Sequence, residues 1–425
     1  MKDLEIDAVT KRIVQYALSN EGVTELRAKP FITDKETILY TQEIIQDLSL
    51  IPLYNEFELN HFVDITHVIM KLTHLPYSVN GEELFDLKEY LNSAKLLIEY
   101  TKLPKRGNES RSTEYPSKSL INELDENLMR LFKEIDYTLE SPGNVKSSHP
   151  VIAKLLRNLE QKRASRSSYS STYLTEHKDV SSSLVPSYKD NRVVLPIRND
   201  RRSEVEGFVH SSSKTSSTLF MESYPLVELN NGVVLLQQEI EIEIAKIIGA
   251  LSKMALECVD LIISLQKEIG YVDSLYALAR YKAEAKCSFA QIDESMEIHL
   301  YEARHPLLKD KCVPITVNIS DNIRSVVLSG PNAGGKTVTI KTIALMAYMN
   351  QTFCMVPARD GSSLPLFSSI YSDIGDEQSI EKSLSTFSSH MKRISGILKE
   401  VDTHSLVILD ELGSGTDPIE GSAIA

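Results

Sequence analysis

Residues 326–342 read VVLSGPNAGGKTVTIKT, and this stretch decides the fold of the C-terminal part of the chain. The residues from Gly330 to Thr337 fit the phosphate-binding loop pattern G-x-x-x-x-G-K-[ST]. The apolar run Val326–Leu328 predicts a strand before the loop, and Lys336–Met349 predicts a helix after it. Because strand, loop and helix follow one another as such a loop requires, the sequence predicts a nucleotide-binding α/β domain.

The residue types in this loop suit the phosphates of ATP. Glycine allows backbone N–H groups to curl round phosphate oxygens, and the start of the following helix adds positive potential. Lys336 is expected to reach the β- and γ-phosphates, and Thr337 is expected to ligate Mg²⁺. The residues that we expect to contact the nucleotide are Gly330, Pro331, Asn332, Ala333, Gly334, Gly335, Lys336, Thr337 and Val338.

A second motif supplies the acidic half of an ATPase site. The apolar strand predicted at Leu406–Leu409 is followed directly by Asp410 and Glu411. Successive residues of a strand point in different directions, so Asp410 can position Mg²⁺ while Glu411 activates water. A helix-capping aspartate is the alternative for such a pair, and the phosphate loop upstream favours the catalytic interpretation.

The rest of the chain divides by its periodicity. Residues 1–165 repeat apolar side chains at helical spacing, with Asp34 as the N-cap of one helix. Residues 164–185 are rich in serine and are expected to form a mobile connection. Short runs of β-branched and aromatic residues between Asn191 and Ser223 predict a small β-rich module.

Helical spacing returns after Pro225. From Ile240 to Leu265 the apolar residues alternate spacings of four and three, which predicts a long packed helix pair with a break at Gly249 or Gly270. We interpret this seam as the core of a helix bundle in preference to a dimerising coiled coil. Acidic and basic residues interrupt the stretch throughout, so a membrane span is not expected.

The net charge of −13 would repel a polyanion if the charge were evenly spread. Any contact with nucleic acid must therefore come from a local basic patch. Basic residues gather around the β-rich module, where they predict either a phosphate contact or an ordinary solvated face. These residues are Arg157, Lys162, Arg163, Arg166, Arg192, Arg198, Arg201 and Arg202.

The cellular compartment is suggested by what the sequence lacks. Its four cysteines have no disulfide-type or metal-type spacing. The first residues are charged and lack the basic start and apolar core of a secretory signal. We therefore expect a cytoplasmic protein.

Three blocks of sequence resemble the ATPase core of the MutS family. They are residues 330–342 (GPNAGGKTVTIKT), 373–391 (DIGDEQSIEKSLSTFSSHM) and 409–418 (LDELGSGTDP). Residues 303–308 and 192–231 are similar to the family's entry strand and clamp segment, so the likeness covers nearly the whole chain. The blocks are closer to the second branch of the family, which lacks the mismatch-recognition domain, than to the mismatch-repair branch.

The resemblance implies an ABC-type ATPase in which two subunits of a homodimer sandwich ATP. By that analogy Gln378 senses the γ-phosphate and Mg²⁺, and the segment Ser383–Phe387, with Ser383 and Ser385, completes the partner's site. Asp417 is expected in the loop that links the two sites. A serine-rich helix start is a reasonable anion contact, although without the resemblance a polar surface helix would be the better interpretation.

We therefore expect a multidomain protein. Residues 1–185 are expected to form an all-helical lever and core domain, residues 186–225 a small β-rich clamp-like insertion, and residues 226–296 long helices that return to the core. Residues 297–425 are expected to form an α/β P-loop ATPase domain that is incomplete at its C-terminus. In the family, further strands, a switch histidine and a nuclease-like domain follow, and we expect no counterpart of them in these 425 residues.

The function that the resemblance implies is ATP hydrolysis with Mg²⁺, coupled to clamping of branched or recombination-intermediate DNA in DNA repair or suppression of recombination. One alternative is a ribosome-associated ATPase in the rescue of stalled translation, with the ribosome or rRNA as partner. Another is a binding module that does not hydrolyse ATP.

Overall fold

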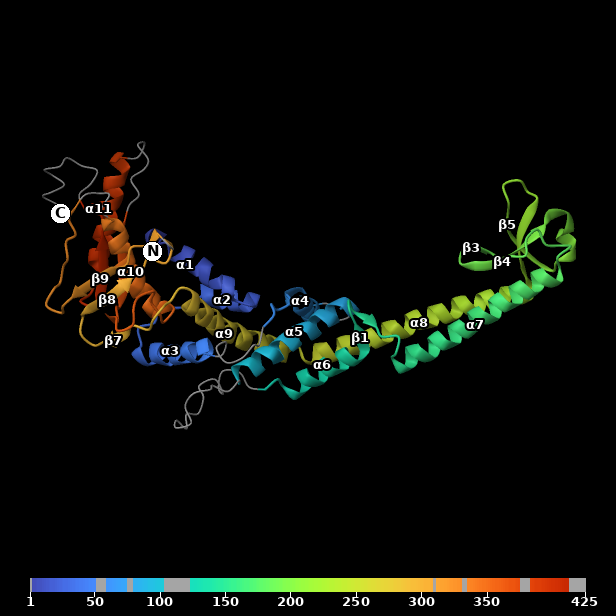
Figure 1. Cartoon of the computed structure of the whole chain (residues 1–425), viewed down its shortest axis with the longest axis horizontal. Coiled ribbons are helices and arrows are strands. Elements are labelled where there is room, and N and C mark those ends of the chain that lie inside the picture. The colour runs from blue at the N-terminus through green and yellow to red at the C-terminus, as the bar shows by residue number, and fades with distance from the viewer. Residues whose placement is uncertain are drawn as a thin grey trace. The chain divides into compact units, whose positions relative to one another are not determined.

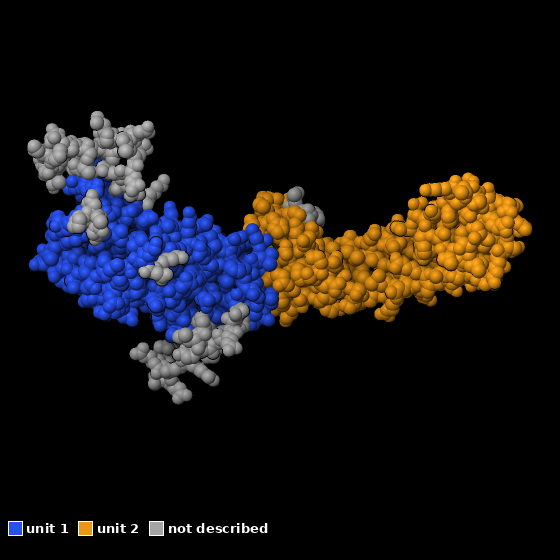
Figure 2. Space-filling view, turned by 45° about the horizontal axis from the view of Figure 1, so that its top comes forward, with its two compact units in different colours: residues 1–64, 90–125, 261–425 blue, residues 65–89, 126–260 orange. Residues whose placement is uncertain are grey.

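The computed structural model describes residues 2–50, 59–74, 79–102, 123–308, 311–330, 335–374 and 383–412. The chain divides into two compact units, which Figure 2 shows in different colours. Unit 1 comprises residues 1–64, 90–125 and 261–425, and unit 2 comprises residues 65–89 and 126–260. None of the helices in the described ranges combines the length and the apolar character needed to cross a bilayer.

Unit 2 is built around two long antiparallel helices. α7 (Pro150–Glu176) and α8 (Tyr224–Glu257) lie side by side (Figure 1). The shorter elements of this unit are α4 (Thr66–His74), the first part of α5 (Gly81–Thr101), α6 (Glu126–Thr138), β1 (Leu139–Glu140) and β2 (Asn144–Val145). α4 and α6 pack against α8, while β1 and β2 form a small antiparallel hairpin within a region for which only helices were expected.

The serine-rich stretch 164–185 is largely helical, so the prediction of a mobile connection is wrong for most of it. α7 continues through Glu176 because its buried side chains recur at helical spacing along the whole helix. These buried residues are Ile152, Leu155, Leu159, Arg166, Ser170 and Leu174. The hydroxyls of Ser165 and Ser170 donate to the carbonyl oxygens four residues earlier, at 3.0 and 2.8 Å, so the helix itself satisfies them.

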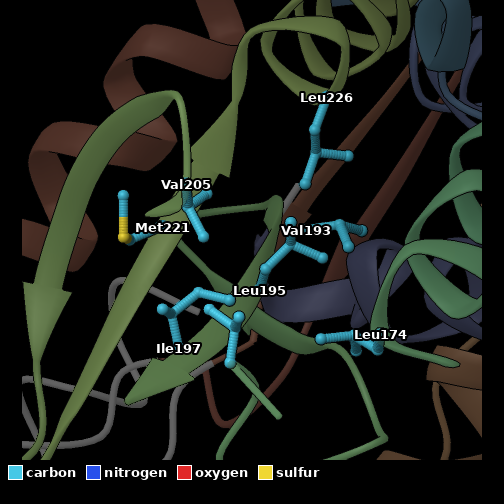
Figure 3. Packing of buried hydrophobic residues seen from close by; sticks show 8 residues of the cluster. Leu174, Val193, Leu195, Ile197, Val205, Met221 and Leu226 are labelled. Carbon is cyan, nitrogen blue, oxygen red and sulfur yellow. The ribbon is translucent and has the colours of Figure 1, made fainter. Parts of the chain in front are cut away.

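A four-stranded antiparallel sheet joins the end of α7 to the start of α8 (Figure 1). Its strands, in spatial order, are β3 (Ser187–Lys189), β4 (Arg192–Arg198), β6 (Thr218–Ser223) and β5 (Gly207–Ser212), and the short helix η6 (Asn199–Glu204) follows β4. The β-branched and aromatic runs predicted as strands all form strands. Alternate residues of β4 share a core with residues of both helices (Figure 3). This core consists of Leu174, Val180, Val193, Leu195, Ile197, Val205, Met221 and Leu226.

Unit 1 contains the N-terminal helices together with parts of two later helices. They are η1 (Lys2–Leu4), α1 (Ile6–Ile13), η2 (Val14–Tyr16), α2 (Asn20–Arg27), α3 (Lys35–Leu50), the rest of α5, and α9 (Val259–Glu284) from Leu261 onwards. The predicted N-cap is confirmed, because the Asp34 carboxylate accepts hydrogen bonds from the backbone N–H and the hydroxyl of Thr37 at 2.8 and 2.6 Å.

The fully buried Asp273 of α9 joins that helix to the start of α2. Its carboxylate accepts hydrogen bonds from the backbone N–H groups of Leu18 and Ser19, and from the Ser19 hydroxyl at 2.6 Å. The Ser19 oxygen in turn accepts from the N–H of Gly22 at 3.0 Å, which caps α2. One buried acid therefore satisfies donors that would otherwise be lost at a helix end.

The long helical seam breaks at Cys258, between α8 and α9, and both glycines at which a break was expected lie inside helices. Gly270 serves close packing instead, because a Cβ added there would lie 3.0 Å from the Cβ of Glu21. Gly249 has open space around it. Glycine lowers helix propensity, but packing on neighbouring elements decides where a buried helix ends.

The C-terminal part of unit 1 contains two sheets. The first has the order β7 (Gln291–Asp293), β10 (Ser363–Pro365), β8 (Ile298–Ala303) and β9 (Ile315–Ile319). The second pairs β11 (Ser369–Asp373) in parallel with β12 (Ser405–Leu409). The helices of this part are α10 (Lys336–Thr352), which packs against β12, and α11 (Ser383–Glu400), which packs against β11. The predicted helix after the phosphate loop and the predicted strand before Asp410 are confirmed.

The strand predicted at Val326–Leu328 does not form. Val326, Val327 and Leu328 are 55, 89 and 42% exposed, and no described residue pairs with their backbone. A strand needs a neighbouring backbone to complete its hydrogen bonds. The apolar pattern therefore indicated residues that favour burial but not the strand that would pair with them.

Candidate nucleotide-binding site

Two glycines shape the backbone around the predicted phosphate loop. Gly330 has φ 151° and Gly335 has φ 78°, conformations that residues with a Cβ rarely adopt. Gly335 is the N-cap of α10, so the N–H groups of the first helical turn have no carbonyl partner within the helix. The start of α10 thus has the features of an anion-binding helix N-terminus.

The side chain of Lys336 reaches back to Gly330, the first residue of the predicted loop. Its Nζ donates a hydrogen bond to the carbonyl oxygen of Gly330 at 2.7 Å. This bond joins the two ends of the loop motif that the structure describes. The flexible lysine stem allows the ammonium group to exchange this carbonyl for phosphate oxygens without moving the helix.

Thr337 and Asp410 are brought into direct contact, although they are 73 residues apart in the sequence. The Thr337 hydroxyl donates to Asp410 Oδ2 at 2.6 Å. Asp410 directly follows β12, and its N–H donates to the Asp373 carbonyl at the end of β11 at 3.0 Å. The parallel pairing of β11 with β12 therefore aligns the acidic residue with the first turn of α10.

Glu411 leaves the strand in a left-handed conformation with φ 47°. Its N–H donates to Asp410 Oδ1 at 3.1 Å, and its side chain is exposed. A non-glycine residue with positive φ is uncommon and redirects the chain sharply. The backbone of the chain thus turns at Glu411, directly after Asp410.

Two oxygen-bearing side chains of this candidate site would suit Mg²⁺. In the described part of the chain, no group of three or more His, Cys, Asp or Glu side chains could hold a metal ion. Mg²⁺ needs no such group, because it is commonly held by one or two protein oxygens together with water and phosphate oxygens. The hydroxyl of Thr337 and the carboxylate of Asp410 fit that requirement.

Several predicted site residues lie outside the described residues. They are Pro331, Asn332, Ala333, Gly334, Gln378 and Asp417. Ser383 and Ser385 lie in the first turn of α11, and only their backbone is described. Val338 lies in the first turn of α10 and is 41% exposed. Their roles at the nucleotide remain predictions.

A polar network next to the site was not predicted from the sequence. The buried carboxylate of Asp373 accepts hydrogen bonds from His390 Nδ1 at 2.8 Å and from Arg393 Nη1 at 3.1 Å. Arg393 also donates to Asp3 at 2.8 Å. The only available signal was the position of Asp373 at a strand end inside a quoted block, because its partners follow no short spacing rule.

Most basic residues around the unit 2 sheet are engaged within the fold. Arg166 bonds to Asn230, Arg192 to Glu222 and Asn231, Arg198 to Asp200, Arg201 to Glu204, and Arg202 to two backbone carbonyls. Arg157 and Arg163 are exposed on α7, and among the described residues neither has an acidic partner. Lys162 packs its stem beside Gly232. The free positive charge of this group is therefore on α7 rather than on the sheet.

Known proteins resemble the chain over its full length. The family model of MutS domain V matches residues 326–425. An endonuclease MutS2 of Caldanaerobacter subterraneus subsp. tengcongensis is 33% identical over 438 residues, which covers 100% of this chain and 53% of the relative. An endonuclease MutS2 of Staphylococcus carnosus is 32% identical over 440 residues, covering 99% of this chain and 54% of the relative. One of Acetivibrio thermocellus is 44% identical over 238 residues, covering 56% of this chain and 30% of the relative. The chain spans about half the length of the curated relatives it matches.

Proposed function

The chain belongs to the MutS family, of the MutS2 type, and from this premise we propose that it hydrolyses ATP and clamps structured nucleic acid in DNA repair or the control of recombination. The observation that carries the ATPase proposal is the 2.6 Å hydrogen bond between Thr337 and Asp410. It places a hydroxyl and a carboxylate together beside a helix N-terminus, which is the ligand arrangement that MgATP needs.

Each residue of the site has a defined task in this proposal. The N–H groups at the start of α10 and the ammonium group of Lys336 bind the β- and γ-phosphates. Thr337 and Asp410 would hold Mg²⁺, which would offset the charge that develops on the phosphate oxygens. Glu411, whose side chain is exposed next to Asp410, orients the attacking water and accepts its proton.

A second subunit would complete the site. Following the family resemblance, Gln378 would contact the γ-phosphate and Mg²⁺ in its own subunit. Ser383 and Ser385, at the N-terminus of α11, would face the γ-phosphate of the partner's nucleotide, and Asp417 would lie between the two sites. A helix start that carries hydroxyls is a suitable anion contact, which supports this arrangement.

The nucleic-acid part of the proposal is supported by the names of the relatives and by the charge of α7. Arg157 and Arg163 are exposed without acidic partners among the described residues, so phosphate oxygens can bind them without breaking an ion pair. Branched DNA is the expected ligand. Phosphate contacts do not by themselves distinguish DNA from rRNA, so the test includes a structured rRNA fragment.

The test compares ATP binding and steady-state hydrolysis by the full chain with those of Lys336→Ala and Glu411→Ala, with and without a four-way DNA junction. Lys336→Ala should weaken ATP binding. Glu411→Ala should still bind ATP, but its hydrolysis rate should fall by at least about 10²-fold, because the general base is lost. Lys399→Ala, in the last turn of α11, is the control and should behave as wild type.

The outcomes separate the candidate functions. Turnover that depends on Glu411 and responds to the junction supports the proposal. ATP binding without turnover identifies a binding module that does not hydrolyse ATP. Stimulation by the rRNA fragment but not by DNA would replace DNA with the ribosome as the partner.

A further inference from the structure

The buried carboxylate of Asp373 connects α11 to the strand that carries the proposed magnesium ligand. Its side chain is 4% exposed and has two donors from α11, His390 Nδ1 at 2.8 Å and Arg393 Nη1 at 3.1 Å. Its backbone carbonyl accepts the N–H of Asp410 at 3.0 Å. One residue thus contacts α11 through its side chain and the Mg²⁺-site residue through its backbone.

The network extends to the N-terminus of the chain. Arg393 Nη1 also donates to Asp3 Oδ2 at 2.8 Å, and η1, which contains Asp3, packs against β11 and α10. The arginine is half exposed, whereas both carboxylates that it contacts are largely buried. Arg393 therefore neutralises two acids at once and holds three segments that are far apart in the sequence.

The chemistry of Asp373 defines the role of the histidine. An ionised carboxylate only accepts hydrogen bonds, so His390 must carry a proton on Nδ1. Removing that donor leaves a buried carboxylate oxygen without one of its partners, which is costly in a low-dielectric site. A shift of the end of β11 would relieve this cost, and the N–H of Asp410, which bonds to the Asp373 carbonyl, would follow it.

We propose that His390 and Arg393 are positioning residues for ATP hydrolysis. By holding the Asp373 carboxylate, they keep Asp410 in place for Mg²⁺ and keep α11 fixed against the end of β11. This inference rests on the proposed ATPase function. It assigns a task to two side chains whose hydrogen bonds, within the described part of the chain, go to Asp373 and Asp3.

The test measures binding of a fluorescent ATP analogue to the full chain, first in EDTA and then during a titration with Mg²⁺, followed by steady-state hydrolysis. His390→Ala should leave affinity in EDTA unchanged, because the phosphate loop is intact. It should raise the Mg²⁺ midpoint and lower kcat by about 10-fold, the usual effect of removing a partner behind a metal ligand. The KM for MgATP at saturating Mg²⁺ should change little.

His390→Asn separates positioning from general packing. The asparagine amide can present an N–H close to the position of Nδ1 while removing the ring, so it should restore most of the Mg²⁺ dependence and kcat. Arg393→Gln should shift the Mg²⁺ midpoint in the same direction as His390→Ala. Lys392→Ala is the control, because Lys392 is the exposed neighbour of Arg393 and makes no ion pair within the described part of the chain.

The outcomes distinguish failure of this inference from failure of the ATPase proposal. A folded His390→Ala protein with wild-type Mg²⁺ midpoint and kcat overturns the inference while leaving the ATPase proposal intact. The same holds if His390→Asn folds but is as impaired as His390→Ala. Wild-type protein that binds no ATP under either condition would overturn the ATPase proposal and this inference together. The Mg²⁺ titration tests the inference even where binding occurs without turnover.

Discussion

Glu222 joins two strands and a helix of unit 2 through a single buried carboxylate. It is 4% exposed, accepts two hydrogen bonds from Arg192 at 2.7 Å each, and accepts a third from Asn230 Nδ2 at 3.0 Å. Burial alone raises the pKa of Glu222, but the hydrogen bonds from Arg192 and Asn230, with the charge of Arg192, outweigh it. The pKa of Glu222 is therefore held below its ordinary value.

This lowered pKa predicts how acid affects the sheet. Because the folded-state pKa is below the unfolded value, the ionised carboxylate stabilises unit 2 above the ordinary glutamate pKa, and this contribution is lost as the pH falls through the folded value. Glu222→Gln should destabilise the sheet by about 1–3 kcal/mol at neutral pH, the typical cost of disrupting a buried charged hydrogen bond. Amide hydrogen exchange of β4 and β6 measures the difference.

The pH dependence distinguishes this explanation from simple loss of packing. The difference in opening free energy between wild type and Glu222→Gln should shrink as the pH is lowered through the folded-state pKa. Glu206→Gln, an exposed acid near the same sheet, should show no difference at any pH. A gap that stays constant down to strongly acid pH would contradict the assigned role of the charge.

At the scale of elements, α7 shows how packing can override local composition. Its serine-rich turns have low helix propensity, yet they bury Ser170 and Leu174 against α8 and the sheet. If the stretch were a mobile connection, proline would be tolerated in it. We expect Ser168→Pro to cost about 3 kcal/mol, because proline removes a helical hydrogen bond and clashes with the preceding turn.

Thermal and urea unfolding of the full chain, together with hydrogen exchange in α7, test this expectation. Ser168 is exposed, so Ser168→Ala keeps the backbone and serves as the matched control with no loss of stability. A Ser168→Pro protein as stable as wild type would restore the mobile connection that the composition suggested.

Elements with a strong local signal were predictable from the sequence. The helix after the phosphate loop, the strand before Asp410 and the strands around Val193–Ile197 all carried such signals. The prediction failed where partners decide the structure. The run Val326–Leu328 has a strand's composition but no paired strand among the described residues, and the helical break fell at Cys258, where no glycine marks it.

At the scale of the whole molecule, the same distinction holds for the candidate site. Thr337 and Asp410 were each identified from a motif, but their contact depends on the parallel pairing of β11 with β12, which no motif encodes. The Asp3–Arg393 contact spans 390 residues of sequence and depends on how the N-terminal segment packs. Patterns thus predicted the chemical groups, while tertiary structure decides which groups meet.

The residues proposed for the two activities belong to different units. If both proposals hold, binding at one site can change affinity at the other. The candidate nucleotide site belongs to unit 1, and the exposed arginines of α7 belong to unit 2. Coupling between two binding sites is reciprocal, so the factor by which ATP changes junction affinity must equal the factor by which the junction changes ATP affinity. We expect typical coupling of about 1–3 kcal/mol, or roughly 5- to 150-fold.

The double variant Arg157→Ala/Arg163→Ala separates the binding site from the coupling. If both arginines contact phosphates, the slope of log K for the junction against log salt should become shallower by about 2, since each contact contributes close to one unit. ATP affinity without DNA should stay at the wild-type value, because the nucleotide site is untouched. Lys253→Ala, an exposed basic residue on α8, controls for general loss of charge. An unchanged salt slope in the double variant would exclude α7 as the nucleic-acid surface. A shallower slope with ATP coupling retained would show that unit 2 holds the nucleic acid. It would also show that the nucleotide in unit 1 controls the affinity for it.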